Sequence, residues 1–304
     1  MDPRVSVLLT TYNQRDFCRD AVLSAVNQDY SNLEVVISDD GSTDGTVQVL
    51  KELKREFPNR IQLFVDQPHL GLTKNCNRAL QACRGDLIAF HAGDDLYLPG
   101  KIAAQVRWFG VDSQRVVCGH QVEVFYQKSD TIHPLTRYMR CGRGPAEWIK
   151  HGGLFGGVST MLRRDHVPPS GFDERVPHVS DTLFVIETLA AGGEFGYIDG
   201  TFARYRKHDN NTTNRWRDCV SEAEKVFSIV EQKYPQYRRY CAEGRVNIVE
   251  YGLAMASLKE GNLTDAGSAF AKIILRHPKH WRSMVRLAQC GLLSGRRALQ
   301  AFAF

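Results

Sequence analysis

The sequence predicts an α/β protein in which a mostly parallel sheet is flanked by helices and followed by a helical C-terminal region. In the first hundred residues, short apolar segments alternate with helical patterns, which is typical of strands joined by helical crossovers. The apolar segments are continuous rather than alternating, as expected for strands buried on both faces. From about residue 217 onward the pattern is almost wholly helical. These three observations fix the predicted class.

The first hundred residues are expected to form alternating strands and helices. The strands are short and rich in Val, Ile and Leu, and the helices repeat apolar residues at helical spacing over about 11 to 13 residues. Ligands of such sheets bind beyond the carboxyl ends of the strands. In chain order the expected elements are Val5–Thr10, Arg15–Asn27, Leu33–Ser38, Thr46–Phe57, Ile61–Val65, Leu72–Ala82 and Asp86–Phe90.

Beyond Pro99 the alternation loosens, and we expect a division into residues 1–100, 101–216 and 217–304. The glycine-rich stretch HGGLFGGVST, residues 151–160, has two readings that the sequence leaves open, as plain turns or as a binding loop. The segment Tyr251–His280 resembles one tetratricopeptide-type hairpin, although an ordinary amphipathic hairpin is the simpler explanation of a single copy. The other expected elements are a helix at Lys101–Phe109, a strand at Val116–Tyr126 and a helix at Asp181–Ala191.

Composition is ordinary for a globular protein, with 43% hydrophobic and 24% charged among 304 residues. No run approaches the roughly 20 apolar residues that span a bilayer, and the N-terminus lacks the features of a signal peptide. We therefore expect a cytoplasmic protein. Its eight cysteines contain no CxxC pair, so we expect free thiols rather than a zinc site or a disulfide framework.

Positive charge is confined to one end of the chain. The net charge is +5, but residues 266–304 hold seven Lys or Arg and no acid, so residues 1–265 hold 32 basic and 34 acidic residues, a net of −2. A nucleic-acid-binding protein would carry its basic residues on the main domain. We therefore expect no nucleic-acid partner.

Polar clusters follow three of the expected strands. Thr10, Tyr12 and Asn13 follow the first strand, and Asp39 and Asp40 follow the second. The fourth strand ends in HAGDD, which places Asp94 and Asp95 side by side. Adjacent like charges repel, and a cation between them and a ligand would offset that cost.

In combination, the segments VSVLLTTYN, VVISDDGSTDGT, HAGDDLYLP and VSDTLFVIETL…YRKHDNN resemble the family 2 glycosyltransferases with the GT-A fold. The resemblance covers about residues 4–213. It implies that residues 1–100 bind a nucleotide-diphosphate sugar and that residues 101–216 bind the acceptor, a glycan or a lipid-linked glycan. It also implies a sugar transfer that inverts the anomeric centre, in cell-envelope polysaccharide biosynthesis.

The resemblance assigns the first two clusters to the nucleotide. Asp40, ahead of Asp39, is expected to accept hydrogen bonds from the base, while Thr10 and Tyr12 wall the same pocket and Asn13 lies beside them. The alternative is structural, because DDGSTDG is rich in turn-forming residues.

The HAGDD segment matches the family's metal-binding element, with Ala92 in place of the usual first acid. The resemblance implies a divalent cation, Mn²⁺ or Mg²⁺, that neutralises the departing diphosphate, and hard oxygen ligands suit either ion. It assigns Asp95 as the direct ligand and places Asp94 near the ribose or the donor sugar. His208, in YRKH, would also ligate the metal or contact the diphosphate. Helix capping by the two acids is the structural alternative.

An inverting transfer needs a base that takes the proton of the acceptor hydroxyl. The family pattern places an acid at a helix start, where the helix dipole keeps a carboxylate ionised. Asp181 occupies that position, although Ser180 replaces the acid that usually precedes it. Asp181 as a simple N-cap is the alternative that the sequence leaves open.

Two other functions compete with the transferase. Because Ala92 and Ser180 depart from the pattern, a catalytically inactive sugar-nucleotide-binding or scaffold protein is one of them. A nucleotidyltransferase is the other, but it expects a glycine-rich triphosphate loop with a Lys after the first strand, and TTYNQRD lacks this loop.

The last 25 residues, 280–304, mix aromatic and aliphatic residues with Arg282, Arg286, Arg296 and Arg297 and contain no acid. This composition suits an interfacial helix on an anionic membrane. The alternative is that the apolar side chains, which include Leu299, Phe302 and Phe304, pack on protein. The resemblance favours the membrane, because many such enzymes act on lipid-linked acceptors at its inner face.

Overall fold

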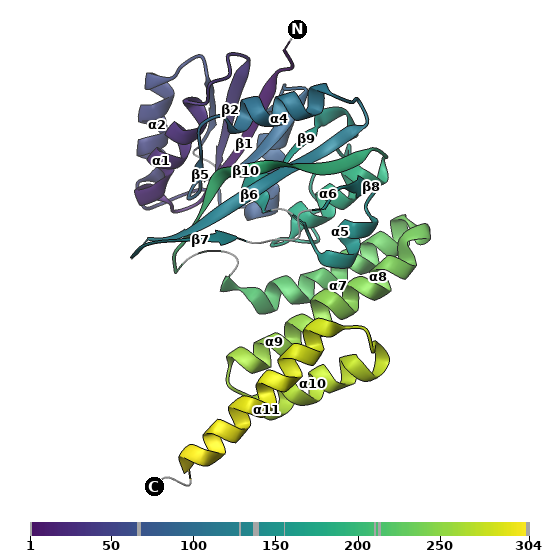
Figure 1. Ribbon diagram of the computed structural model, residues 1–304. Coiled ribbons are helices and arrows are strands. Elements are labelled where there is room, and N and C mark those ends of the chain that lie inside the picture. Colours follow the sequence, from purple (N-terminus) through teal and green to yellow (C-terminus); the bar gives the residue numbers. More distant parts are fainter. Residues whose placement is uncertain are drawn as a thin grey trace. The chain divides into compact units, whose positions relative to one another are not determined.

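The computed structural model describes residues 2–65, 68–127, 129–135, 140–154, 156–209, 211 and 214–301 (Figure 1). The chain forms two compact units. The sheet unit comprises residues 1–148 and 153–214, and the helical unit comprises residues 149–152 and 215–304.

The strands of the described residues form one ten-stranded sheet in the order β3-β2-β1-β4-β9-β6-β10-β5, with β7 on β6 and β8 on β10. Strand β1 pairs in parallel with both β2 and β4, and β2 pairs in parallel with β3. The strands are β1 (Val5–Thr11), β2 (Leu33–Asp39), β3 (Ile61–Phe64), β4 (Leu87–Ala92), β5 (Leu96–Tyr97), β6 (Arg115–Tyr126), β7 (Ser129–Leu135), β8 (Gly142–Arg143), β9 (Met161–Arg163) and β10 (Glu194–Lys207).

Helices lie on both sides of this sheet (Figure 1). The predicted α/β class with flanking helices and a helical C-terminal region is confirmed, and the expected elements of the first hundred residues match the observed ones to within two residues at each end. The helices of the sheet unit, with α5 reaching the helical unit, are α1 (Arg15–Val26), α2 (Thr46–Glu56), α3 (Leu72–Ala82), α4 (Lys101–Gly110), α5 (Ala146–His151) and α6 (Ser180–Ala190).

The second half of the sheet is mixed rather than parallel. Strand β9 is antiparallel to both β4 and β6, whereas β10 runs parallel to β6. Strand β10 was not predicted, since its residues EFGYIDGTFARYRK include two Gly and an Asp. Its pairing with β6 also shifts register near Ile198 and Thr201. Irregularities of this kind break the period-two pattern by which a strand is recognised.

The apolar segments are buried on both faces, as their continuous pattern predicts. On one face Val5, Val7 and Leu9 of β1 pack with buried residues of α1, α2 and α4. On the other face, Phe90 of β4 contacts the rings of Phe172 and Phe184. Burial of this kind contributes about 1.5–3 kcal/mol for each large apolar side chain. The first strands are therefore a rigid base for the loops at their carboxyl ends.

The helical unit has its own small core. Val246, Tyr251, Ala254, Phe270 and Ile273 are buried together. Asn262 caps α10 through its side chain, and Gly261 adopts φ 80° in the preceding turn, a conformation that favours Gly. The elements are α7 (Trp216–Lys233), α8 (Arg238–Gly244), a π-helical segment (Arg245–Glu250), α9 (Tyr251–Lys259), α10 (Leu263–Arg276) and α11 (Trp281–Ala301).

None of the helices in the described ranges combines the length and apolar character needed to cross a bilayer. All eight cysteines are free thiols. The absence of disulfides agrees with the scattered spacing of the cysteines in the sequence.

Candidate active site

The polar clusters meet at one edge of the sheet because β1 lies between β2 and β4. Thr10 is level with Ser38 on one side and with Ala92 on the other. The backbone N–H of Gly93 donates to the carbonyl of Thr10 at 2.9 Å, and that of Asp40 donates to Thr11 at 3.0 Å. The two carboxylate pairs therefore follow neighbouring strand ends, as the parallel sheet predicts.

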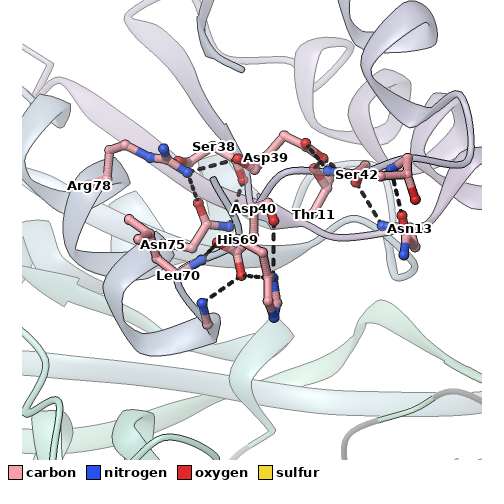
Figure 2. Close-up of polar contacts among 12 residues, drawn as sticks. Thr11, Asn13, Ser38, Asp39, Asp40, Ser42, His69, Leu70, Asn75 and Arg78 are labelled. Atoms are coloured by element: carbon pink, nitrogen blue, oxygen red, sulfur yellow. Dashed lines mark hydrogen bonds and ion pairs between the residues drawn. The ribbon is translucent and has the colours of Figure 1, made fainter. Parts of the chain in front are cut away.

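Asp39 is held entirely by the protein (Figure 2). Its carboxylate accepts hydrogen bonds from the hydroxyl of Thr11 at 2.8 Å and from both the backbone N–H and the hydroxyl of Ser42, at 2.8 and 2.6 Å. The residue is fully buried. These contacts are those of the turn that the sequence offered as the structural alternative.

Asp40 anchors the loop that precedes α3 (Figure 2). Its carboxylate oxygens accept the backbone N–H groups of Leu70 and Gly71 at 2.8 and 2.9 Å, and the Nδ1 of His69 lies 2.9 Å from Oδ2. From the other side, Arg78 of α3 donates to the carbonyl of Asp39 at 2.8 Å. Asp40 keeps lone pairs for a further donor, because each carboxylate oxygen accepts about two hydrogen bonds.

Tyr12 and His69 form a stacked aromatic pair beside Asp40, with ring centroids 4.3 Å apart. The Tyr12 side chain is 44% exposed and presents a flat surface. Asn13 has φ 50° and links β1 to the next loop, since its N–H donates to Ser42 Oγ and its Oδ1 accepts from the Thr43 N–H. The structure thus gives Asn13 a local structural contact and joins Tyr12 to Asp40 through His69.

At the end of β4, Asp94 pairs with His208. The imidazole Nε2 lies 2.9 Å from Asp94 Oδ2, and Asn211 donates to the same oxygen at 3.4 Å. Both side chains of the pair are about nine-tenths buried. Two residues 114 positions apart in sequence thus meet at one point, because β10 returns the chain to the end of β4.

Asp95 has a different environment from its neighbour. Its carboxylate accepts the backbone N–H of Arg206 at 3.0 Å. Burial, and secondly the charge of Asp94, raise the pKa of Asp95 well above its usual value. The Arg206 guanidinium lies 4.9 and 4.6 Å from the ring centroids of Phe17 and Phe125 and donates to the carbonyl of Asp94 at 2.8 Å.

Arg206 and Gly93 are both packed tightly in this cluster. The Arg206 side chain is only 11% exposed, so its charge is buried beside the two carboxylates. Gly93 does not leave room for a ligand, since a Cβ there would lie 2.4 Å from Thr11 Cγ2 and 2.5 Å from Gln14 Oε1. A glycine is needed because the β4 end packs tightly against the loop after β1.

The donor atoms at the β4 end suit a divalent cation shared with a diphosphate. In the described part of the chain, no group of three or more His, Cys, Asp or Glu side chains is arranged to hold a metal by itself. Asp94 and His208 supply one carboxylate oxygen and one imidazole nitrogen, both ligands of Mn²⁺. Gln14 Oε1, beside Gly93, is a buried oxygen without a hydrogen-bond partner in the described residues. The set fits a cation whose remaining ligands come from its substrate.

Asp181 lies in the first turn of α6, and its side chain is exposed. The N-cap of α6 is Val179, so Asp181 is not the N-cap that the sequence left as an alternative. Its Oδ1 accepts the N–H of Thr182 at 2.8 Å, and a Cβ on Gly157 would lie 3.7 Å from its Oδ2. The glycine-rich segment therefore runs beside the Asp181 carboxylate.

Cys76 of α3 lies between the two sides of the site. Burial, and secondly the negative charge of Asp181, raise its pKa to about 12, and the Asp40 charge acts in the same direction. A hydrogen bond with Thr10 opposes the shift. Asp40, Thr10 and Asp181 therefore all act on the same thiol.

Three residues of this site were not predicted from the sequence: His69, Asn211 and Arg206 as a buried group. His69 and Asn211 stand in irregular segments, where periodicity carries no signal. The local sequence signal for His69 is its position two residues before Gly71, the N-cap of α3.

Comparison with known proteins points to the glycosyltransferase family that the sequence motifs resemble. Residues 6–167 match the model of the glycosyl transferase family 2, a span that includes both carboxylate pairs but neither Asp181 nor His208. An uncharacterized protein of Mycobacterium tuberculosis is 25% identical over 236 residues, which cover 73% of this chain and 63% of that protein. The chain thus matches less than two thirds of the length of this relative. The putative glycosyltransferase EpsE of Bacillus subtilis is 32% identical over 123 residues, 40% of this chain and 44% of EpsE.

Solved structures share the fold. TarS residues 1–349 of S. aureus, in complex with UDP-GlcNAc, has a TM-score of 0.66 at 16% identity and covers 89% of this chain and 80% of its own. The mannosyltransferase PcManGT from Pyrobaculum calidifontis, in complex with GDP-Man and Mn²⁺, has a TM-score of 0.63 at 17% identity and covers 96% and 87%. The expected GT-A fold is thereby confirmed.

Proposed function

The chain belongs to glycosyl transferase family 2, and we propose that it transfers a sugar from a nucleotide-diphosphate sugar to an acceptor hydroxyl with inversion at the anomeric carbon. The observation that carries the proposal is the buried Asp94–His208 pair at a strand end beside Thr10, one strand away from the Asp40 loop. Two structural neighbours hold nucleotide sugars, UDP-GlcNAc in TarS and GDP-Man in PcManGT, which supports a donor of this class.

The base of the donor binds at the β2 end. Tyr12 stacks on it, and Asp40 or the backbone of the loop that Asp40 anchors accepts its N–H groups. Thr10 lies between this pocket and the diphosphate. Asp39 and Asn13 act indirectly, since their hydrogen bonds hold the loop after β2 in place. Residues 1–100 therefore bind the donor, and residues 101–216 bind the acceptor.

The diphosphate binds at the β4 end, where Asp94 and His208 would hold Mn²⁺ or Mg²⁺. A cation held there would supply positive charge against the charge that develops on the departing nucleoside diphosphate. The sequence interpretation made Asp95 the direct ligand. We instead assign Asp94 as the first ligand and Asp95 as its neighbour, because the imidazole of His208 lies against Asp94 while Asp95 accepts the N–H of Arg206.

Asp181 is the general base. Its carboxylate takes the proton of the acceptor hydroxyl while that oxygen attacks the anomeric carbon from the face opposite the diphosphate. The new C–O bond forms as the bond to the diphosphate oxygen breaks, and in-line displacement inverts the centre. The first turn of α6 keeps the carboxylate ionised, and its exposure leaves it accessible to an acceptor.

The acceptor that we propose is a glycan or a lipid-linked glycan. A lipid-linked acceptor would require a peripheral position at the inner face of the membrane, with residues 280–304 in contact with anionic lipid. Phe302 and Phe304 of this segment lie outside the described residues, and so does the side chain of Leu299.

A thermal-shift screen of UDP- and GDP-sugars, with and without Mn²⁺, tests the donor. We expect one nucleotide sugar to raise the melting temperature, with a larger rise in Mn²⁺. Turnover is then followed as release of the nucleoside diphosphate. Stabilisation without any release, in the presence of candidate acceptors, would favour the inactive binding protein that Ala92 and Ser180 suggest. No stabilisation by any nucleotide sugar would contradict both functions.

A further inference from the structure

Helix α11 is apolar on two opposite sides. One side packs on α10 within the helical unit, where Ser283 and Cys290 are buried and Leu287 joins the core around Phe270. Figure 1 shows α10 and α11 as antiparallel neighbours. This side alone therefore packs α11 against the rest of the helical unit.

The opposite side is uncovered in the described chain. Trp281, Met284, Val285 and Leu292 are 64%, 43%, 55% and 72% exposed. Their positions i, i+3, i+4 and i+11 fall on one face of a helix, with Ala288 between them. We call these five residues the α11 stripe. Scattered exposed apolar residues are normal, but a continuous helical face that includes Trp is typical of a contact surface.

Basic residues border the α11 stripe at one end and along one flank. Lys279 is exposed two residues before Trp281, and Arg282 and Arg286 follow one flank of the stripe. Both arginines are also tied to Tyr251, with the Arg282 guanidinium 4.3 Å from the ring centroid and Arg286 Nε 3.5 Å from the hydroxyl. From residue 266 to residue 304 the sequence contains no acid.

We infer that the α11 stripe docks reversibly on an anionic lipid surface, with the helix lying in the plane of the interface. This inference rests on the proposed function and names the surface through which the enzyme reaches its lipid-linked acceptor. A helix with an apolar face bordered by cations and without acids has the composition of an interfacial helix. Trp at one end suits the boundary between headgroups and acyl chains.

Charge decides between lipid and a second copy of the chain. In a two-fold symmetric dimer through the same face, the basic residues of one copy would face those of the other, and residues 266–304 supply no acid to pair with them. An anionic surface instead attracts each of them. The apolar face and the positive charge therefore both favour an anionic lipid surface over a second copy of the chain.

Co-sedimentation of the full chain with vesicles tests the inference. One set is phosphatidylcholine alone, and the other contains phosphatidylglycerol in addition. We expect binding only to the anionic vesicles, with loss at high salt. The double variant Trp281→Ser and Leu292→Ser should bind at least about tenfold more weakly, and Lys279→Glu should weaken binding by less.

Leu253→Ser is the matched control, because Leu253 is a 51% exposed leucine of α9 in the same unit but outside the stripe. It should bind vesicles as the unchanged protein does. Absence of binding to either vesicle would overturn the inference, and so would equal loss in the control variant. A dimer that only the stripe variant dissociates, in sedimentation equilibrium, would identify a second copy as the occupant. Nucleotide-sugar stabilisation in the same samples reports on the transferase independently, so failure of one proposal does not imply failure of the other.

Discussion

The two carboxylate pairs of the site follow the two parallel strands that flank β1, yet the protein satisfies them to different degrees. At the β2 end, Asp39 accepts three hydrogen bonds and Asp40 accepts two from backbone N–H groups, with His69 as a further partner. At the β4 end, Asp94 contacts His208 and Asn211 through one oxygen only, and Asp95 accepts one backbone N–H. The raised pKa of the Asp95 carboxyl reflects burial beside the Asp94 charge.

This difference separates carboxylates that stabilise the fold from carboxylates that a bound cation would stabilise. A buried carboxylate with several donors is stable as an anion, whereas two neighbouring buried carboxylates with few donors are stabilised by added positive charge. Under the proposed function, the β2 end shapes the pocket for the base, and the β4 end is where the cation and the diphosphate bind. Asp181, exposed in the first turn of α6, is proposed to act in catalysis rather than in folding.

The largest expected effect concerns Asp181. Asp181→Asn keeps the size of the side chain and removes its basicity, so we expect kcat to fall by about 10² or more with donor affinity unchanged. Because Val179 rather than Asp181 is the N-cap, the melting temperature should hardly move. Steady-state kinetics and calorimetry measure the two quantities. Normal turnover with a lower melting temperature would place Asp181 with the structural acids.

Next in size is the effect of Asp39→Asn on stability. Asn retains one acceptor oxygen in place of a carboxylate that receives three hydrogen bonds in a fully buried position, so we expect a loss of about 1–3 kcal/mol in the free energy of unfolding. Asp94→Asn is the matched change at the β4 end and should cost less or even stabilise the metal-free protein, because it removes a charge beside Asp95. Urea unfolding of both variants compares them directly. Equal losses of stability in the two variants would contradict the distinction between the β2 end and the β4 end.

A pH-dependent effect is expected from Lys101, the first residue of α4. Lys101 is fully buried, hydrogen-bonded to Gln105 at 2.7 Å and 4.1 Å above the ring of Tyr97 in β5. Burial lowers its pKa to about 7 from 10.5. Between these values the unfolded chain binds the extra proton, so stability rises with pH by up to about 1.4 kcal/mol per unit.

Lys101→Met should lack this rise, so its stability relative to the unchanged protein is highest at or below pH 7 and declines toward pH 10. Chemical denaturation at several pH values measures the slope. Parallel curves for the two proteins would mean that Lys101 stays charged in the fold.

The smallest effect is expected at the aromatic pair. Tyr12→Ala removes the stacking surface beside Asp40 while leaving the buried network intact, so donor affinity should fall by about threefold to tenfold. Tyr12→Phe is the control and should bind normally, since stacking needs only the ring. Loss of affinity in both variants would point to the hydroxyl instead.

The sequence predicted the parts of this site that stand on regular elements. Continuous apolar strands fixed the parallel half of the sheet, and the acids at their ends followed from that topology. The sequence did not distinguish Asp39 from Asp94, because the difference lies in donors from distant segments: Ser42 and Thr11 for one, His208 and Asn211 for the other. Strand β10, which carries His208 to the site, was missed because its bulges hide the alternation.

Isothermal titration of the donor nucleotide sugar into Asp94→Asn, with and without Mn²⁺, tests the division between the two ends most directly. The unchanged protein should bind more tightly in Mn²⁺. The variant should keep the affinity seen without metal, which the β2 pocket supplies, and lose the gain that Mn²⁺ provides. The same gain from Mn²⁺ in the variant as in the unchanged protein would contradict the assignment of the β4 end as the cation and diphosphate site.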